Sequence, residues 1–560
     1  MPCCRPSCRP ISTRLGWIGL ALIAGPSPLA AQHEHRGRSE VPATDPVRVG
    51  SIVFPNSGAR AAQPAFLRGV ALLHSFSYEQ AAAAFREAQR RDPSFALAHW
   101  GEALAQRMPQ GWGEDTLAAR AVLARLGATP AARAAKARTP RERAYIAAVE
   151  TLFGADGDTT ARDVTGVIET LGRLRIDSLR ITRYAEAMRR LHRAYPDDDE
   201  AAAFYAHALM NRRNLELETL LRTSVEMAAA VEDLFRRNPD HPGAAHFLIH
   251  AYDDARLAPL GLRAARAYAR IAPTEQHAQH MPSHIFFQLG LWSEAVTANE
   301  RAFALVRAEG GTDPRAPYSW DWHPVDFLQH ALIEAGRWRE AKAIADTATA
   351  LLTPARLAVL EPDQRNRQRG LRRFARKYAM ETTEQADEDS ARWTFPSAAI
   401  AYRKGDRARL DTLPRVIELD VEVPQSLREH FATEARAYHL ALDGQRDSAV
   451  TMLRRDCAAR YVGELVSAGE GPRSALARAC QIAGEILLEA GRARAAVDAY
   501  DDALRIAPGY WRARLGRARA LTRVGDAAGA RAAYAELLAQ WSKADLDLPA
   551  LAEVKAGAAP

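Results

Sequence analysis

Hydrophobic positions recur along the chain with the period of an amphipathic helix. In 240–254, the i, i+3, i+4, i+7 spacing of a buried stripe is filled by Ala245, Leu248, Ile249 and Tyr252. Alanine and arginine are abundant, aromatic residues make up 7% of the chain, and runs of β-branched residues are scarce. This composition is typical of helices. The pattern predicts an all-α protein.

The helical pattern repeats at a fixed interval near the C-terminus. Glycine, alanine and aromatic positions recur 34 residues apart, as in Gly491 and Gly525, Ala496 and Ala530, Tyr500 and Tyr534, and Ala503 and Leu537. A helix, a turn at glycine, a second helix and a proline-marked turn describe a helical hairpin. A similar order of small and aromatic residues recurs near Gly69, Gly290 and Gly336. Hairpins are therefore expected over most of 62–542.

These positions resemble the tetratricopeptide repeat (TPR) family in period and in small and aromatic pattern. The resemblance implies a right-handed superhelical solenoid of helix-turn-helix repeats, with a concave groove that receives ligands. We expect an N-terminal TPR-like array at 61–354, a charged bridging segment at 355–392, a C-terminal TPR array at 393–545 and a tail at 546–560.

Several longer motifs resemble a narrower group of exported bacterial TPR proteins. They are FPNSG at 54–58, GVALLHSFSYEQA at 69–81, DPSFALAHWGEAL at 92–104, HPGAAHFLIHAYDD at 241–254 and HMPSHIFFQLGLW at 280–292. This second resemblance supports the predicted fold and export. It implies no particular reaction.

The N-terminus has the features of a secretory signal. Arg5, Arg9 and Arg14 precede a short apolar run, and small residues near Ala31 suit cleavage. We expect a signal peptide at 1–31 and a disordered leader at 32–60, with an uncleaved N-terminal anchor as the alternative. Because no later apolar stretch is long enough to cross a bilayer, the mature protein should be periplasmic or extracellular without a membrane span.

Charge and cysteine content narrow the chemistry. The chain carries a formal net charge of +7, but its arginines are spread through the helices without a basic patch, which argues against a nucleic-acid partner. Cys457 and Cys480 are the cysteines that remain after removal of the signal. They can form a disulfide or stay as two thiols. Without CxxC or CxxCH, thiolate zinc sites and covalent haem are not supported.

Histidines occupy a repeated frame in the middle of the chain. His207, His250 and His284 each lie 11 residues after a proline, and His246 and His280 each lie seven residues after one. Placed on the first helices of successive hairpins, histidines and acids form a stripe, which comprises His207; His246 and His250; His277, His280 and His284; and His323, Asp326 and His330, with Asp253 and Asp254 at its edge. The TPR resemblance implies that this stripe faces the concave groove.

Adjacent hairpins lie about 10 Å apart, so facing histidines can reach one metal ion. An i, i+4 pair from each of two neighbouring hairpins supplies four nitrogens, and the first-choice ligands are therefore His246, His250, His280 and His284, followed by His330 and Asp326. His207, Asp253, Asp254, His277 and His323 are assigned to the surrounding groove. Zinc, copper, nickel and iron all suit imidazole ligands.

Three functions fit this stripe. The favoured one is an exported TPR scaffold that binds a protein or peptide through its groove, with a transition metal at the histidines as one form of that site. The alternative is a metal- or haem-binding protein, or a metal-dependent enzyme. Catalytic residues are not assigned, because the chain has no HExxH, nucleophile elbow or phosphate-binding loop. The histidines are not required by the repeat, since the slots of His246 and His250 hold Gln481 and Glu485 further along.

Overall fold

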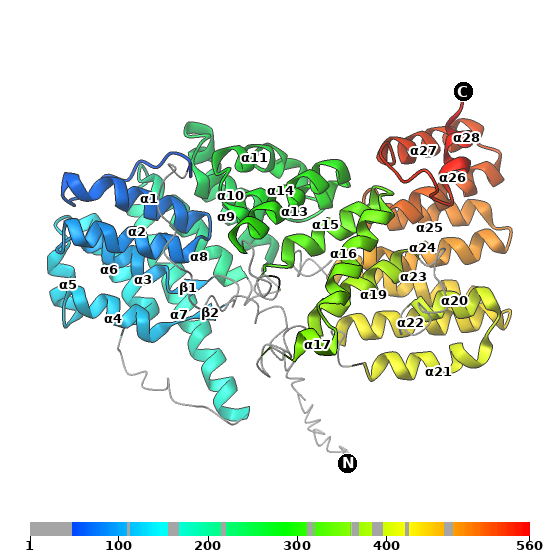
Figure 1. Cartoon of the computed structure of the whole chain (residues 1–560), viewed down its shortest axis with the longest axis horizontal. Helices are drawn as coiled ribbons and strands as arrows, with labels where there is room; N and C mark the ends of the chain where they lie inside the picture. The colour runs from blue at the N-terminus through cyan, green and yellow to red at the C-terminus, as the bar shows by residue number, and fades with distance from the viewer. Residues whose placement is uncertain are drawn as a thin grey trace, which may run out of the picture.

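The structure is a computed structural model that describes residues 48–108, 113–154, 167–213, 220–310, 317, 320–358, 360, 369–382, 396–420, 425–463 and 474–560. The expected signal peptide and most of the expected leader lie outside the described residues. Within the described ranges the regular secondary structure is almost entirely helical, as the hydrophobic pattern predicts (Figure 1). The exception among these residues is an antiparallel pair of two-residue strands, β1 (Arg107–Met108) and β2 (Gly113–Glu114).

Helices of the first half run from the short 3-10 helix η2 to α14. They are η2 (Arg60–Ala62), α1 (Gln63–His74), α2 (Tyr78–Arg91), α3 (Ala96–Leu104), α4 (Thr116–Leu126), α5 (Pro130–Lys136), α6 (Pro140–Phe153), α7 (Val167–Ala194), α8 (Asp199–Arg213), α9 (Leu220–Arg237), α10 (Pro242–Tyr252), α11 (Ala258–Ile271), α12 (Gln276–His280), α13 (Pro282–Leu289) and α14 (Trp292–Gly310).

Helices of the second half run from α15 to α28. They are α15 (His323–Glu334), α16 (Trp338–Ala350), α17 (Pro354–Leu357), the 3-10 helix η6 (Arg369–Leu371), α19 (Arg372–Glu381), α20 (Pro396–Lys404), α21 (Arg407–Glu418), α22 (Gln425–Leu442), α23 (Arg446–Gly463), α24 (Ser474–Glu489), α25 (Ala493–Ile506), α26 (Trp511–Val524), α27 (Ala527–Gln540) and α28 (Leu551–Ala558).

Each helix packs mainly on its neighbours in sequence, so the helices stack in chain order from one end of the molecule to the other (Figure 1). Tyr500 on α25 shows how this stacking is achieved. Its ring lies against Gly484 on α24 and Gly516 on α26, where an added Cβ would come within 2.7 Å and 2.3 Å of ring atoms. Glycine is therefore needed on both sides for the large aromatic ring to fill the space between adjacent hairpins.

One turn geometry recurs between paired helices. A left-handed residue ends the first helix, and the next residue donates its N–H to the carbonyl five positions earlier, as Leu291 does to Phe286 at 2.8 Å. The left-handed position is filled by Gly290, Gly336, Gly405, Gly444, Gly491 and Gly525, and in the first hairpin by Phe76. Glycine adopts this conformation without strain, whereas a bulky side chain does not. Phe76 is therefore an exception to be explained.

Packed residues occur in three segments that the sequence places outside the two arrays. Part of the expected disordered leader is packed against the helices, because Phe54 is 3% exposed and Ser51 donates its N–H to the Asp240 carbonyl at 2.9 Å. The expected bridging segment includes α19, whose fully buried Phe374 joins α15 and α16. The expected tail includes α28, which packs on α27 through buried Val554. In each segment the apolar stretch is too short to reveal a repeat in the sequence, but in the folded chain its side chains pack against neighbouring helices.

The last hairpins also contact the middle of the chain directly. The Trp292 indole donates to the Gly509 carbonyl at 3.0 Å, and the backbone N–H of Trp511 donates to the Glu334 carboxylate at 2.9 Å. The N–H of Asp545 donates to the Gly336 carbonyl at 3.0 Å. The turns after α13 and α15 are thus held by residues more than 170 positions later in the chain.

Cys457 on α23 and Cys480 on α24 form a disulfide, with their Cα atoms 5.6 Å apart. This resolves the choice that the sequence leaves open.

In the part of the chain that the structure describes, none of the helices combines the length and the apolar character needed to cross a membrane.

Candidate metal centre

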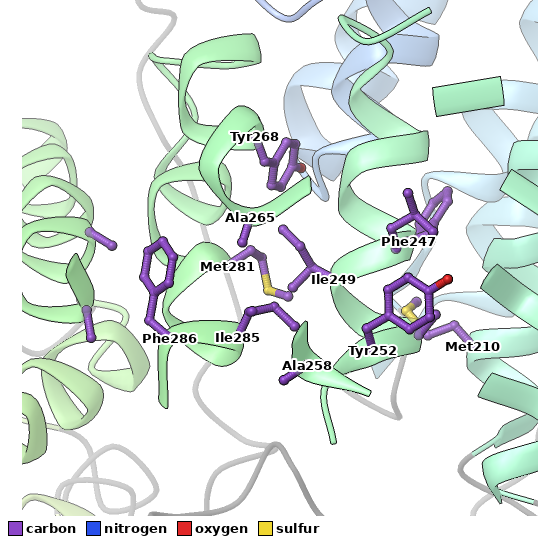
Figure 2. Packing of buried hydrophobic residues seen from close by; sticks show 14 of the residues in the cluster. Met210, Phe247, Ile249, Tyr252, Ala258, Ala265, Tyr268, Met281, Ile285 and Phe286 are labelled. Atoms are coloured by element: carbon purple, nitrogen blue, oxygen red, sulfur yellow. The ribbon is translucent and has the colours of Figure 1, made fainter. Parts of the chain in front are cut away.

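Helix α10 places two histidines beside a fully apolar face. Its N-terminus is capped by His241, whose Nδ1 accepts the N–H of Ala244 at 3.1 Å. Figure 2 shows Ile249 of α10 lying close to Met281 and Ile285 of the next hairpin. With this apolar side fixed against its neighbours, the i, i+4 pair His246 and His250 is held on another part of the helix surface.

His246, His250 and His277 form the first cluster, here called triad 1. Nε2 of His246 lies 3.0 Å from Nε2 of His250 and 3.1 Å from Nε2 of His277. His246 is completely buried and His250 is buried, whereas His277 is partly exposed. One potential ligand atom from each residue lies within 4.8 Å of the other two.

His280, His284 and His323 form the second cluster, here called triad 2. Nε2 of His280 and Nε2 of His284 lie 3.0 Å apart, and the ring of His323 is centred 4.7 Å from the ring of His280. Again two members are buried and the third is partly exposed. The three residues come from α12, α13 and α15, so this triad joins two successive hairpins.

The Nδ1 atoms of three histidines meet oxygen acceptors outside the triads. His246 contacts the backbone carbonyl of His74 at 2.6 Å, His280 contacts Oδ1 of Asn299 at 2.7 Å, and His284 contacts the Asp253 carboxylate at 2.9 Å. The amide of Asn299 is oriented because its Nδ2 donates to the Ala295 carbonyl at 2.8 Å. Since these oxygens accept hydrogen bonds, the proton of each neutral ring lies on Nδ1, and the Nε2 lone pair points into the triad.

This tautomer assignment has a chemical consequence in triad 2. The Nε2 atoms of His280 and His284 are both acceptors, yet they lie only 3.0 Å apart in a buried place. Two lone pairs at that distance repel each other unless a cation, either a proton or a metal ion, lies between them. Two nitrogen ligands on one tetrahedral ion would be about 3.3 Å apart. The observed separation therefore suits joint ligation.

Burial favours the neutral form of four of the triad histidines. It lowers the pKa of His246 to about 3 and the pKa of His280 well below its usual value, with neighbouring histidines adding to the effect. Burial likewise lowers the pKa of His277 well below the ordinary value and that of His323 to about 4. Neutral imidazole is the form that binds metal ions, and protons compete weakly with a metal when the pKa is low.

Phe76 covers triad 1. Its ring centroid lies 4.4 Å from that of His246, 5.0 Å from that of His277 and 6.0 Å from that of His250. Its φ of 60° is the left-handed conformation that the other turns of this geometry give to glycine. Strained residues of this kind are frequent at functional sites. The strain at Phe76 places an aromatic ring over the histidines, a position that glycine would leave uncovered.

A third group combines His74, Glu200 and His241 behind triad 1. Nε2 of His74 lies 2.7 Å from one Glu200 oxygen, and Nε2 of His241 lies 3.0 Å from the other. Burial alone would raise the pKa of Glu200, but the two histidines lower it to about 2. Each carboxylate oxygen thus accepts a hydrogen bond from one ring. The group is therefore explained by a structural role, because it links α1, α8 and α10 through hydrogen bonds. It positions His74, whose carbonyl orients His246.

The remaining predicted ligands lie outside the triads. Asp326 forms ion pairs with Lys377 at 2.7 Å and Arg373 at 3.3 Å. Burial would raise the pKa of Asp326, but these two cations lower it to about 2. Nε2 of His330 lies 3.6 Å from a Glu334 oxygen. Both residues lie on α15 together with His323, but Asp326 pairs with Lys377 and Arg373, and His330 lies beside Glu334.

Among the residues assigned to the groove, His277 and His323 are members of the triads, and Asp253 hydrogen-bonds to His284. Asp254 instead forms an ion pair with Arg256 at 3.1 Å. The ring of His207 is centred 6.1 Å from that of Phe76, beside triad 1.

The histidines are more enclosed than the expected groove implies. His246 and His280 have no exposed surface, and none of the predicted site residues lines the cavity of about 440 Å³ bounded by Asn56, Arg141 and Tyr195. The four histidines expected at one site lie instead in two clusters of three, because α12 contributes His277 to triad 1 and His280 to triad 2. Sequence reasoning missed Phe76 and Asn299. The HSFSY motif, with phenylalanine at the turn position, is the signal that could have indicated Phe76.

Comparison with known proteins gives no assignment. No protein-family model matches the chain, and no curated protein matches its sequence. The TPR resemblance therefore stays a prediction, and the proposed chemistry depends on the geometry of the site.

Proposed function

We propose that this chain is an exported, TPR-like helical-repeat protein that binds transition-metal ions at triads 1 and 2. The observation that carries the proposal is the 3.0 Å approach of two Nε2 lone pairs, those of His280 and His284, whose Nδ1 atoms are held by Asn299 and Asp253. Histidine ligands in metal sites commonly have such an oxygen partner on the distal nitrogen.

The donor type limits the metal. Three imidazoles suit zinc, copper, nickel or iron, whereas magnesium and calcium prefer oxygen ligands. The Cys457–Cys480 disulfide supports export, because disulfides persist in oxidising compartments.

Hydrogen-bonded recognition of a peptide by the histidine stripe has less support. Four of the six triad histidines, His246, His250, His280 and His284, are at most 7% exposed, so a peptide would have little access to their nitrogens.

The test is metal content of the untagged, full-length protein after dialysis against zinc, copper, nickel or iron. The wild type should retain at least one of these ions at near-stoichiometric level, and His284→Gln should lose the ion of triad 2. Two matched controls should retain the wild-type amount. His439→Gln replaces a partly exposed histidine paired with Asp443 at 3.1 Å, and His330→Gln replaces a buried histidine outside the triads.

Circular dichroism of each variant checks that the helices are intact. Absence of every metal from the folded wild type would refute the proposal. Equal metal loss in His330→Gln and His284→Gln would move the site to a different set of histidines. A visible spectrum of the same samples separates simple ligation from haem binding, the other form of histidine site suggested by the sequence.

A further inference from the structure

The two triads are immediate neighbours. Between triads, the ring centroids of His277 and His280 are 6.3 Å apart and those of His250 and His284 are 6.4 Å apart. Within a triad, neighbouring rings are only slightly closer, as in His246 and His277 at 4.9 Å. The six histidines therefore form one continuous cluster with two centres.

Helix α12 joins these centres rigidly. His277 and His280 are three residues apart on this helix, and each contributes to a different triad. An ion bound to imidazole lies about 3 Å from the ring centroid. The ring distances between triads therefore limit the separation of two bound ions to about 13 Å or less. Ions so close must interact electrostatically, and paramagnetic ions such as Cu(II) must also interact magnetically.

Among the described residues, few carboxylates lie close enough to this cluster to neutralise the charge of two metal ions. All six candidate ligands are imidazoles, and Asp253 places a carboxylate on the ring of His284. Near His323, the negative charge of Asp326 is already offset by Lys377 and Arg373, so Asp321, whose carboxylate accepts the backbone N–H of His323 at 3.0 Å, is the other nearby anion. Two divalent ions would bring four positive charges into this buried region, which is strongly unfavourable without added anions.

Copper fits these constraints better than the other candidates. It has the highest affinity for nitrogen sites among the divalent ions of the series, and its monovalent state halves the charge to be buried. A three-imidazole set is also sufficient for Cu(I), which accepts three ligands. Iron and manganese sites, in contrast, commonly include carboxylate ligands.

We propose that triads 1 and 2 form one dinuclear copper centre, with one ion in each triad and Cu(I) as the state that the apo-protein takes up. The proposal rests on the function proposed above and adds the number of ions, their identity and their coupling. Each triad has one partly exposed member, His277 or His323, which provides the side from which an ion can enter.

The first experiment measures stoichiometry. The apo-form of the full-length protein is titrated anaerobically with Cu(I) against a coloured Cu(I) chelator, and in parallel with Zn(II). The wild type should take up two Cu(I) per chain, whereas His246→Gln and His284→Gln should each take up one. Uptake of a single Cu(I), or tighter binding of Zn(II) than of copper, would overturn the copper centre and leave metal binding intact. If no metal binds, both proposals fail.

The second experiment measures coupling. After chemical oxidation of the loaded protein to Cu(II), the electron paramagnetic resonance spectrum of the wild type should be broadened or diminished per copper relative to the one-copper variant His246→Gln. An unbroadened spectrum equal to the sum of two independent sites would show that the ions are too far apart for one centre. His330→Gln serves as the matched control and should give the wild-type spectrum.

Discussion

Two regions of this protein bury histidine in opposite ways. In the C-terminal half, Nδ1 of His430 contacts the Asp456 carboxylate, and its Nε2 lies 3.2 Å from the Glu434 carboxylate. Burial alone would lower the pKa of His430, but these two carboxylates raise it to about 9. In the middle region, each oriented ring has one oxygen partner and turns its other nitrogen toward another imidazole. The first arrangement holds a proton, and the second is suited to a metal ion.

The difference shows that the partners of both ring nitrogens decide the role of a buried histidine. The hairpin architecture itself is neutral, because the slots of His246 and His250 in the C-terminal region hold Gln481 and Glu485, and then Leu515 and Arg519. Gln481 and Leu515, which both occupy the slot of His246, are buried as His246 is. The helical hairpins can therefore carry apolar, polar or imidazole side chains at this position without changing their fold.

The largest expected effect is the loss of both ions in the double variant His246→Gln/His284→Gln. A ligand present at 100 times its Kd stabilises the folded state by about 2.7 kcal/mol. Wild-type protein should therefore unfold at a higher temperature when copper is added, and the double variant should not. The measurement is thermal unfolding with and without the ion. A metal-dependent shift that persists in the double variant would place the binding residues elsewhere.

The pH dependence of stability should have opposite signs in the two regions. The folded pKa of His430, about 9, exceeds the unfolded value, so its stabilisation is full below about pH 6.5 and is lost as pH rises through 9. Burial lowers the pKa of His207 to about 3, so the unfolded chain binds more protons and stability falls as pH decreases below 6.5.

Denaturant unfolding of the metal-free protein at several pH values tests this contrast. His430→Gln should reduce the loss of stability between pH 6.5 and 9, and His207→Gln should reduce the loss between pH 6.5 and 3. The expected slope is up to about 1.4 kcal/mol per pH unit for each histidine. Identical pH profiles for the wild type and both variants would contradict the assigned protonation states.

A smaller effect is expected from the outer carboxylate of each region. Asp253→Asn replaces the carboxylate on Nδ1 of His284 and should weaken the ion of triad 2 by about 10- to 100-fold, because such partners orient and strengthen the ligand. Asp456→Asn makes the same change beside His430 and should alter the alkaline stability without affecting metal affinity. Competition with a chelator gives the affinities. Equal affinity in the two variants would remove Asp253 from the site.

The smallest effect concerns the backbone at Phe76. Because its φ is 60°, Phe76→Gly should be about 1 kcal/mol more stable than Phe76→Ala, which also removes the ring but retains the left-handed strain. Both variants should release metal from triad 1 faster than the wild type, since they uncover it. Denaturant unfolding and chelator-driven release rates measure the two effects. Unchanged release rates would limit Phe76 to a packing role.

Local spacing predicted which histidines of one segment lie next to each other. The i, i+4 pairs His246 and His250, and His280 and His284, do meet through their Nε2 atoms. This succeeds because residues four apart lie on the same side of a helix. The all-helical fold and the turn at Gly525 were predicted for the same reason, since helical period and turn chemistry depend on neighbouring residues.

Only the tertiary structure decided which helices share a site. Asp326 and His323 are on the same helix. However, Asp326 forms an ion pair with Lys377 on α19, whereas the ring of His323 packs against that of His280. The partners of these two residues differ because contacts between helices depend on packing angles and on segments distant in sequence. The sequence by itself determined the helices and the rows of histidine upon them. Tertiary packing determined the division into two triads, their burial, their oxygen partners and the aromatic cover of Phe76.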